Sequence, residues 1–196
     1  MCGRFRLPSA EENSPQAQRV LQAVRSLYSQ APEERKEGQE DCLPGQALPA
    51  YTPNGPALVR WGLAMPGRRG NPLINLRAES ALEKPFFRRA LTGNGRCLFP
   101  AAAYQEGSKE GQRLLFRPVA GGLLFLAGVL LPPAEPRGLP RALVLTTEAN
   151  DSVRPFHHRM PLILPAEQCR PFLFRPERLE ALLAQRPALL QPILLP

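Results

Sequence analysis

The segment GGLLFLAGVLLPP, residues 121–133, is the longest apolar run in this chain and limits the choice of fold. A helix that crosses a membrane needs roughly 18 to 20 apolar residues, which this run does not reach. Paired glycines precede the run and paired prolines follow it, as at the two ends of a strand. The segment therefore predicts a buried β-strand.

Further short runs of the β type lie on both sides of this segment, with turns rich in glycine and proline between them. They are ALVRWGLAM (57–65), RCLFPAAAYQE (96–106), RLLFRPV (113–119) and RALVLTTEA (141–149). Spacing of apolar residues predicts a helix over 14–30, whose apolar face comprises Val20, Leu21, Val24, Leu27 and Tyr28. We expect a shorter helix within 80–95 and an amphipathic helix at the start of 176–196.

Helices that flank a run of mostly consecutive strands are typical of the α+β class. A length of 196 residues suffices for one domain with one sizeable core. No internal repeat or interdomain linker divides the sequence, so we expect a single domain over residues 1–196. The 24 prolines favour a loop-rich fold over a helical bundle.

The chain is strongly basic, with a net charge of +8 and an isoelectric point near 10.0. Such a charge suits an anionic partner, nucleic acid ahead of a membrane surface, although it also serves solubility alone. Hydrophobic residues make up 43% of the chain, which argues against general disorder. The first twelve residues carry charges and no apolar stretch, so we expect no secretion signal and a cytoplasmic protein.

The four cysteines, Cys2, Cys42, Cys97 and Cys169, are widely scattered. None forms a pair or cluster with the spacing of metal ligands, so we expect free thiols and no metal or other cofactor. Cys2 follows Met1 directly, and an initiator methionine is normally removed before a small residue. Removal would leave Cys2 with an α-amine and a thiol on adjacent carbons, a pair that no other chain position offers.

Three further groups of polar residues have both ordinary and catalytic interpretations. The two histidines of the chain, His157 and His158, are adjacent. A histidine is more often an ordinary surface or core residue than a catalytic one. Asn75, Arg77 and Glu79 alternate, so in an extended segment they would share one face, which could simply be solvated. Glu106 ends a predicted strand, where a carboxylate can act as a general acid or base or only face water.

Taken together, these groups form a pattern. The segments MCGRF (1–5), WGL (61–63), NLRAES (75–80), RCLFPAAAYQE (96–106) and LTTEANDSVRPFHHRMPLIL (145–164) resemble the SRAP family in order and spacing. These are SOS response-associated peptidase-like proteins that process abasic sites. The resemblance covers about residues 1–165 and implies curved, barrel-like, mostly antiparallel sheets flanked by helices. It also implies a covalent crosslink to abasic sites in single-stranded DNA, which shields the lesion.

The implied chemistry explains the position of Cys2. The amine adds to the aldehyde of the ring-opened sugar and loses water to give a Schiff base, and the thiol then closes a thiazolidine ring. An α-amine has a pKa of about 7.7–8.0, so part of it is already neutral at pH 7. The family name further implies a peptidase-like removal of Met1, beside Schiff-base chemistry of the lyase type.

The resemblance also implies roles for single residues. Asn75 would orient the sugar and the Cys2 amine, Glu106 would transfer protons, and His157 would assist opening of the sugar ring. His158 falls on a variable position and is interpreted as incidental. The residues that would hold DNA phosphates are Arg4, Arg77 and Arg159, with Thr146 as a further candidate.

The sequence departs from the family where PAAAYQEG (100–107) lacks the second aromatic residue and the tryptophan after Glu106. That departure concerns contacts at the edge of a DNA duplex more than the chemistry of Cys2. The expected partner is single-stranded DNA with an abasic site, with no membrane involved, and we expect a monomer.

Two other functions remain open. Glutamine amidotransferases with an amino-terminal nucleophile also begin with MCG, but the arginine, Asn-Gly and aspartate motifs that bind glutamine have no convincing match here. A basic DNA-binding module in which Cys2 is only structural is the third possibility.

Overall fold

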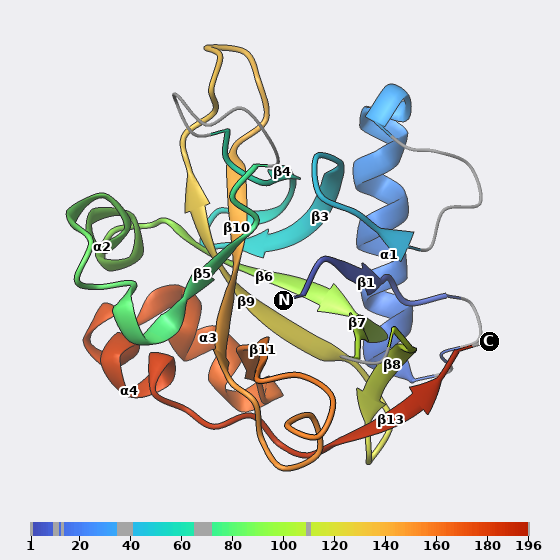
Figure 1. Ribbon diagram of the computed structural model, residues 1–196. Helices are drawn as coiled ribbons and strands as arrows, with labels where there is room; N and C mark the ends of the chain where they lie inside the picture. Colours follow the sequence, from blue (N-terminus) through green and yellow to red (C-terminus); the bar gives the residue numbers. More distant parts are fainter. Residues whose placement is uncertain are drawn as a thin grey trace.

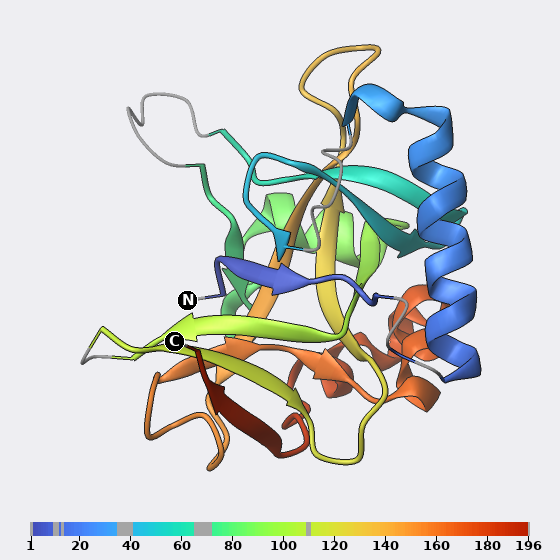
Figure 2. The ribbon, with the colours of Figure 1, turned by 90° about the vertical axis from the view of Figure 1, so that its right-hand side faces the viewer.

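The computed structural model describes residues 2–9, 12, 14–34, 41–64, 72–108 and 111–195. Its strands form two sheets, and the four α-helices pack around them (Figure 1). The predicted α+β class is confirmed. The sheets are curved, as expected (Figure 2).

The smaller sheet is antiparallel and has the strand order β13-β8-β7-β1-β2. Figure 2 shows β1, β7, β8 and β13 lying side by side. The strands are β1 (Arg4–Arg6), β2 (Asp41–Cys42), β7 (Ala103–Gly107), β8 (Arg113–Pro118) and β13 (Leu190–Leu194). This sheet matters for function because β1 carries the start of the chain.

The larger sheet has the order β11-β10-β4-β3-β6-β9-β12, and β5 pairs with β10. Strand β9 also pairs with β10, so the pairings that run from β10 through β4, β3, β6 and β9 return to β10. The sheet is antiparallel except where β10 runs parallel to β4 and to β5. Its strands are β3 (Ala47–Thr52), β4 (Gly55–Trp61), β5 (Asn75–Arg77), β6 (Arg96–Ala101), β9 (Leu124–Leu131), β10 (Arg141–Glu148), β11 (Arg159–Pro161) and β12 (Ile163–Leu164).

The helices are α1 (Pro15–Gln30), α2 (Pro85–Thr92), α3 (Ala166–Phe174) and α4 (Leu179–Leu183), with 3-10 turns η1 (Pro32–Glu34), η2 (Ala78–Ser80) and η3 (Pro176–Arg178). The predicted helix at 14–30 is confirmed. It begins at Ser14, whose hydroxyl accepts a hydrogen bond of 3.1 Å from the Ala17 N–H, as an N-cap does. None of the described helices combines the length and apolarity that crossing a bilayer requires.

Strand β9 explains why the run at 121–133 is apolar throughout, because it separates two hydrophobic cores. Alternate side chains point to opposite faces of a strand. Leu124 and Leu126 face the core between the two sheets and α1, whereas Phe125 and Ala127 face the core beneath α2, α3 and α4. Gly128 interrupts the run because a Cβ there would lie 2.8 Å from the Cys97 Sγ.

Two segments differ from the sequence-based expectation. Residues 75–80 are extended only as far as Arg77 and then form η2, so Glu79 does not continue the strand face of Asn75. Within 176–196, where the sequence predicted only a helix, the end of the chain forms strand β13, which pairs with β8 in spite of Pro192. As the last strand of the smaller sheet, β13 tolerates a proline on its unpaired side.

Arg96 on β6 ties two helices to the larger sheet. The buried guanidinium donates from Nε and Nη2 to the Leu173 carbonyl at the end of α3, at 3.1 and 2.9 Å, and from Nη1 to the Leu91 carbonyl at the end of α2. A cation is favourable at the C-terminus of a helix, where carbonyls lack partners.

We expect Arg96→Met to lower the free energy of unfolding by about 3 kcal/mol, because these buried carbonyls would lose their charged donor. Urea denaturation measures the change. Arg88→Met, on the exposed face of α2, is the matched control and should stay within about 0.5 kcal/mol of wild type. Equal effects of the two substitutions would contradict the capping role of Arg96.

Candidate active site at the amino-terminal cysteine

Strands β1, β5 and β7 bring three of the predicted site residues together. Cys2 lies just before β1 and is buried. Asn75, the first residue of β5, donates from Nδ2 to the Cys2 carbonyl oxygen at 2.9 Å. Its Oδ1 is buried and has no hydrogen-bond partner in the described residues, so one acceptor remains for a ligand.

The Cys2 thiol lies in an apolar and negatively charged environment. Burial raises its pKa to about 12, and the charge of Glu106 adds to the rise, whereas the hydrogen bond to the Arg4 carbonyl (3.9 Å) opposes it. At neutral pH the sulfur therefore carries its proton. Met1, whose removal the sequence predicts, lies outside the described residues.

Glu106 comes from β7, which pairs with β1 in antiparallel register, with Arg4 opposite Gln105 and Phe5 opposite Tyr104. This register places the carboxylate beside the start of the chain. Glu106 is buried, and its charge raises the pKa of the Cys2 thiol. A carboxylate and a protonated thiol at one place form a pair that can exchange a proton.

His157 lies after the turn that joins β10 to β11. Its Nδ1 lies 3.0 Å from the backbone nitrogen and 2.9 Å from the carbonyl oxygen of Arg159, which orients the ring. The His158 ring stacks on it with centroids 4.5 Å apart. Desolvation lowers the pKa of His158, as do the positive charges of His157, Arg159 and Arg77, so this predicted incidental residue lies among the basic side chains.

Arg159 is more enclosed than a surface phosphate ligand would be, with only 8% of the residue exposed. Both of its terminal nitrogens bond to the Glu79 carboxylate at 2.8 Å, and Nη2 also donates to the Thr146 carbonyl at 2.7 Å. Nε is buried without a partner in the described residues. Glu79 and Thr146 therefore do not use the Nε–H of Arg159.

Glu79 is a residue whose partner the sequence did not indicate. Besides Arg159 it accepts hydrogen bonds from the Thr147 hydroxyl at 3.3 Å and the Glu148 N–H at 3.2 Å. Burial alone would raise the pKa of the Glu79 carboxyl, but the Arg159 guanidinium and these donors outweigh burial and hold the pKa below its usual value. The paired arginine thus stays oriented at neutral pH.

The other predicted DNA-binding residues differ in accessibility. Arg77 is exposed, and it forms no ion pair within the part of the chain that the structure describes. Arg4 is partly exposed and lies 3.5 Å from the Asp41 carboxylate. Thr146 is buried, and its hydroxyl accepts from Arg159 at 3.4 Å. Arg77 is therefore the cation most available to a phosphate.

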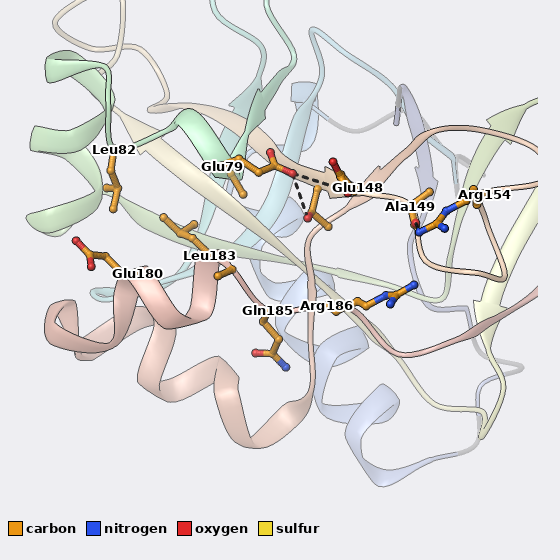
Figure 3. A pocket seen from close by; sticks show the side chains of 12 residues that line it. Glu79, Leu82, Glu148, Ala149, Arg154, Glu180, Leu183, Gln185 and Arg186 are labelled. Carbon is orange, nitrogen blue, oxygen red and sulfur yellow. Dashed lines mark hydrogen bonds between the residues drawn. The ribbon is translucent and has the colours of Figure 1, made fainter.

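A cleft of about 560 Å³ lies beside Glu79. Figure 3 shows the side chains that line it. Glu79 and Glu148 line it on one side and Arg154 and Arg186 at one end, the two arginines sharing the Asp151 carboxylate. None of Cys2, Asn75, Glu106 and His157 lines this cleft. Among the described residues, no group of three or more His, Cys, Asp or Glu side chains could hold a metal ion.

Comparison with known proteins adds to this geometry. The sequence model of the family described as SOS response associated peptidase (SRAP) matches residues 1–193. Abasic site processing protein YoaM of Bacillus subtilis is 30% identical over 178 residues, 84% of this chain and 75% of YoaM. Abasic site processing protein YoqW of the same bacterium is 28% identical over 187 residues, 88% of this chain and 80% of YoqW.

Solved structures share the fold. A crystal structure of a protein from Bordetella bronchiseptica aligns over 100% of both chains with a TM-score of 0.72 and 22% identity. Another, from Bacteroides thetaiotaomicron, aligns over 100% of this chain and 92% of its own with a TM-score of 0.76 and 18% identity.

Proposed function

Because this chain belongs to the SOS response associated peptidase (SRAP) family, we propose that it recognises abasic sites in single-stranded DNA and crosslinks to them through Cys2. The observation that carries the proposal is the enclosure of Cys2 by Asn75 and Glu106 at the start of the chain. The names of YoaM and YoqW, both abasic site processing proteins, support abasic sites as the substrate. We further propose that residues 1–196 act as one domain and as a monomer.

The state of the thiol supports an order of steps. With a pKa of about 12 the thiol is a poor first nucleophile at neutral pH, whereas an α-amine is partly neutral there. Once Met1 is removed, the Cys2 amine attacks the C1′ aldehyde of the opened sugar, and loss of water gives a protonated Schiff base. The sulfur then adds to the same carbon.

The neighbouring residues divide the remaining tasks. The carbonyl oxygen of Asn75, Oδ1, accepts from the reacting amine or from a sugar hydroxyl. Glu106 holds the protons that the amine and thiol release. His157, beside Arg159, assists opening of the sugar ring. Arg77 and Arg4 meet the phosphates on either side of the lesion, and Arg159 is the third candidate for this role.

The proposal is tested with a single-stranded oligonucleotide that carries one abasic site, incubated with the protein and analysed on a denaturing gel after heating. A heat-stable adduct is expected, and an undamaged oligonucleotide of the same sequence should give none. Incubation with glutamine in parallel distinguishes the amidotransferase alternative. Release of ammonia without an adduct would contradict the proposal and support the amidotransferase activity.

The exposure of the arginines predicts different salt effects. Each phosphate contact to a single strand contributes about 0.7 to the slope of log affinity against log salt. Arg77→Ala should remove about that amount from the slope of the crosslinking rate at subsaturating protein, and Arg4→Ala less, because Asp41 already shares its charge. Arg25→Ala, on the exposed side of α1, should leave the slope unchanged. An unchanged slope for Arg77→Ala would mean that the protein binds DNA through a different surface.

A further inference from the structure

The Tyr104 hydroxyl is a buried polar group that the reaction scheme above does not use. The residue is 0% exposed, and its Oη has no hydrogen-bond partner in the described residues. Native proteins keep few such groups, because a buried hydroxyl without a partner loses its hydrogen bonds to water and gains none in return. Fold stability therefore does not account for this hydroxyl, since a phenylalanine would fill the same space.

The placement of Tyr104 relates it to the reacting groups. Tyr104 and Glu106 are two residues apart on β7, so their side chains leave the same face of the strand. The Tyr104 ring stacks on Phe116 of β8, with centroids 5.0 Å apart and planes within 14°, and Phe5 of β1 lies directly opposite in the sheet. The stack on Phe116 orients the ring, and Cys2 and Tyr104 are buried in the same hydrophobic core.

The electrostatic surroundings determine which partner the hydroxyl can serve. Burial raises the pKa of the Tyr104 phenol well above its usual value, and the nearby charges of Cys2 and Glu106 raise it further. The phenol therefore keeps its proton at neutral pH and acts as a hydrogen-bond donor, not as a base. A donor gains most from an atom that becomes negative during the reaction.

We propose that Tyr104 is a positioning residue for ring closure, with its hydroxyl donating a hydrogen bond to the Cys2 sulfur as that sulfur loses its proton. This inference rests on the proposed function. In the step, a bond forms between sulfur and C1′, and the π electrons of the protonated C=N bond move to nitrogen. The thiol proton passes to the Glu106 carboxylate, so the charges of iminium and carboxylate cancel.

This role is confined to the second step. Formation of the Schiff base depends on the lone pair of the amine, which a phenolic donor does not assist. Closure requires partial negative charge on a sulfur whose surroundings disfavour it, because the site is apolar and Glu106 is adjacent. The hydrogen bond from Tyr104 offsets part of that penalty when the ring closes.

Tyr104→Phe tests the inference, since it keeps the ring and its stacking and removes only the hydroxyl. Reactions are quenched over time with and without borohydride, which traps the Schiff base. We expect the borohydride-trapped adduct to appear at a rate within about twofold of wild type. Adduct that survives heating without borohydride should form about 10- to 100-fold more slowly, the value of one hydrogen bond to a charged atom. The melting temperature should be unchanged or higher.

Tyr28→Phe is the matched control, because the Tyr28 hydroxyl is also buried but donates to the Ala47 carbonyl at 3.0 Å. It should lower the melting temperature and leave both reaction rates unchanged. The inference is overturned if Tyr104→Phe closes the ring as fast as wild type, or if it slows both steps equally. If wild-type protein forms no adduct, the proposed function itself fails and this inference with it.

Discussion

Replacing Cys2 with alanine is expected to abolish the heat-stable adduct with abasic single-stranded DNA, while a Schiff base that borohydride can trap still forms. Alanine is also small, so Met1 should still be removed and the α-amine should remain. Without the neighbouring thiol no thiazolidine can close, and the Schiff base returns to amine and aldehyde or leads to strand cleavage by β-elimination. Denaturing gels with and without borohydride measure both products.

Cys42→Ala is the matched control for this result. Cys42 is a second buried thiol on the same sheet, where it pairs with Phe5 of β1. It lacks an α-amine that could become free, so its loss should leave the adduct intact. A Cys2→Ala protein whose unreduced adduct lasted as long as that of wild type would leave the thiol without a role.

The amine can be tested separately from the thiol. A variant with one extra residue that is retained before Cys2 keeps the thiol but holds the nitrogen in an amide. No thiazolidine should form, because the nitrogen next to the thiol is then an amide and does not condense with an aldehyde. The mass of the intact wild-type protein should correspondingly lack one methionine.

Glu106→Gln should slow crosslinking by about 10²- to 10⁴-fold, the usual contribution of a positioned acid–base group. Glutamine keeps the shape of the side chain but can neither accept the thiol proton nor return it. Affinity for the oligonucleotide should change little, since Glu106 is buried and its carboxylate would not attract phosphates. Single-turnover rates at saturating protein measure the effect, with binding followed separately by fluorescence anisotropy.

The histidines provide an internal comparison for this second prediction. His157→Ala should also slow the reaction, and His158→Ala, which removes the exposed ring that stacks on His157, should have little effect on the rate. A rate within threefold of wild type for Glu106→Gln would reduce that residue to a structural role, and the same limit applies to His157→Ala.

Local sequence patterns predicted those parts of the fold that depend on neighbouring residues. The apolar run of β9, the amphipathic spacing of α1 and the α+β order of elements follow from periodicities of two and 3.6 residues, which are visible within one segment. The family was likewise identified from short motifs. These motifs contain Cys2, Asn75, Glu106 and His157, whose proposed roles depend on what each side chain can do chemically.

Periodicities within one segment do not predict contacts between distant segments. Glu79 and Arg159 are 80 residues apart, and only the approach of η2 to β10 and β11 shows that the predicted phosphate ligand is held in an ion pair. The sequence predicted only a helix within 176–196, yet the free edge of the smaller sheet accepts β13 and its Pro192. Each outcome depends on which surfaces meet, and that is decided by packing across the whole chain.

The sequence by itself determined which chemical groups this protein has, including a cysteine that follows the first methionine. Only the tertiary structure decided their environment. Burial and the charge of Glu106 raise the pKa of the Cys2 thiol to about 12, and Asn75 donates a hydrogen bond to the Cys2 carbonyl oxygen. The physical reason is that desolvation and the fields of nearby charges act through space, from strands that the chain sequence keeps far apart.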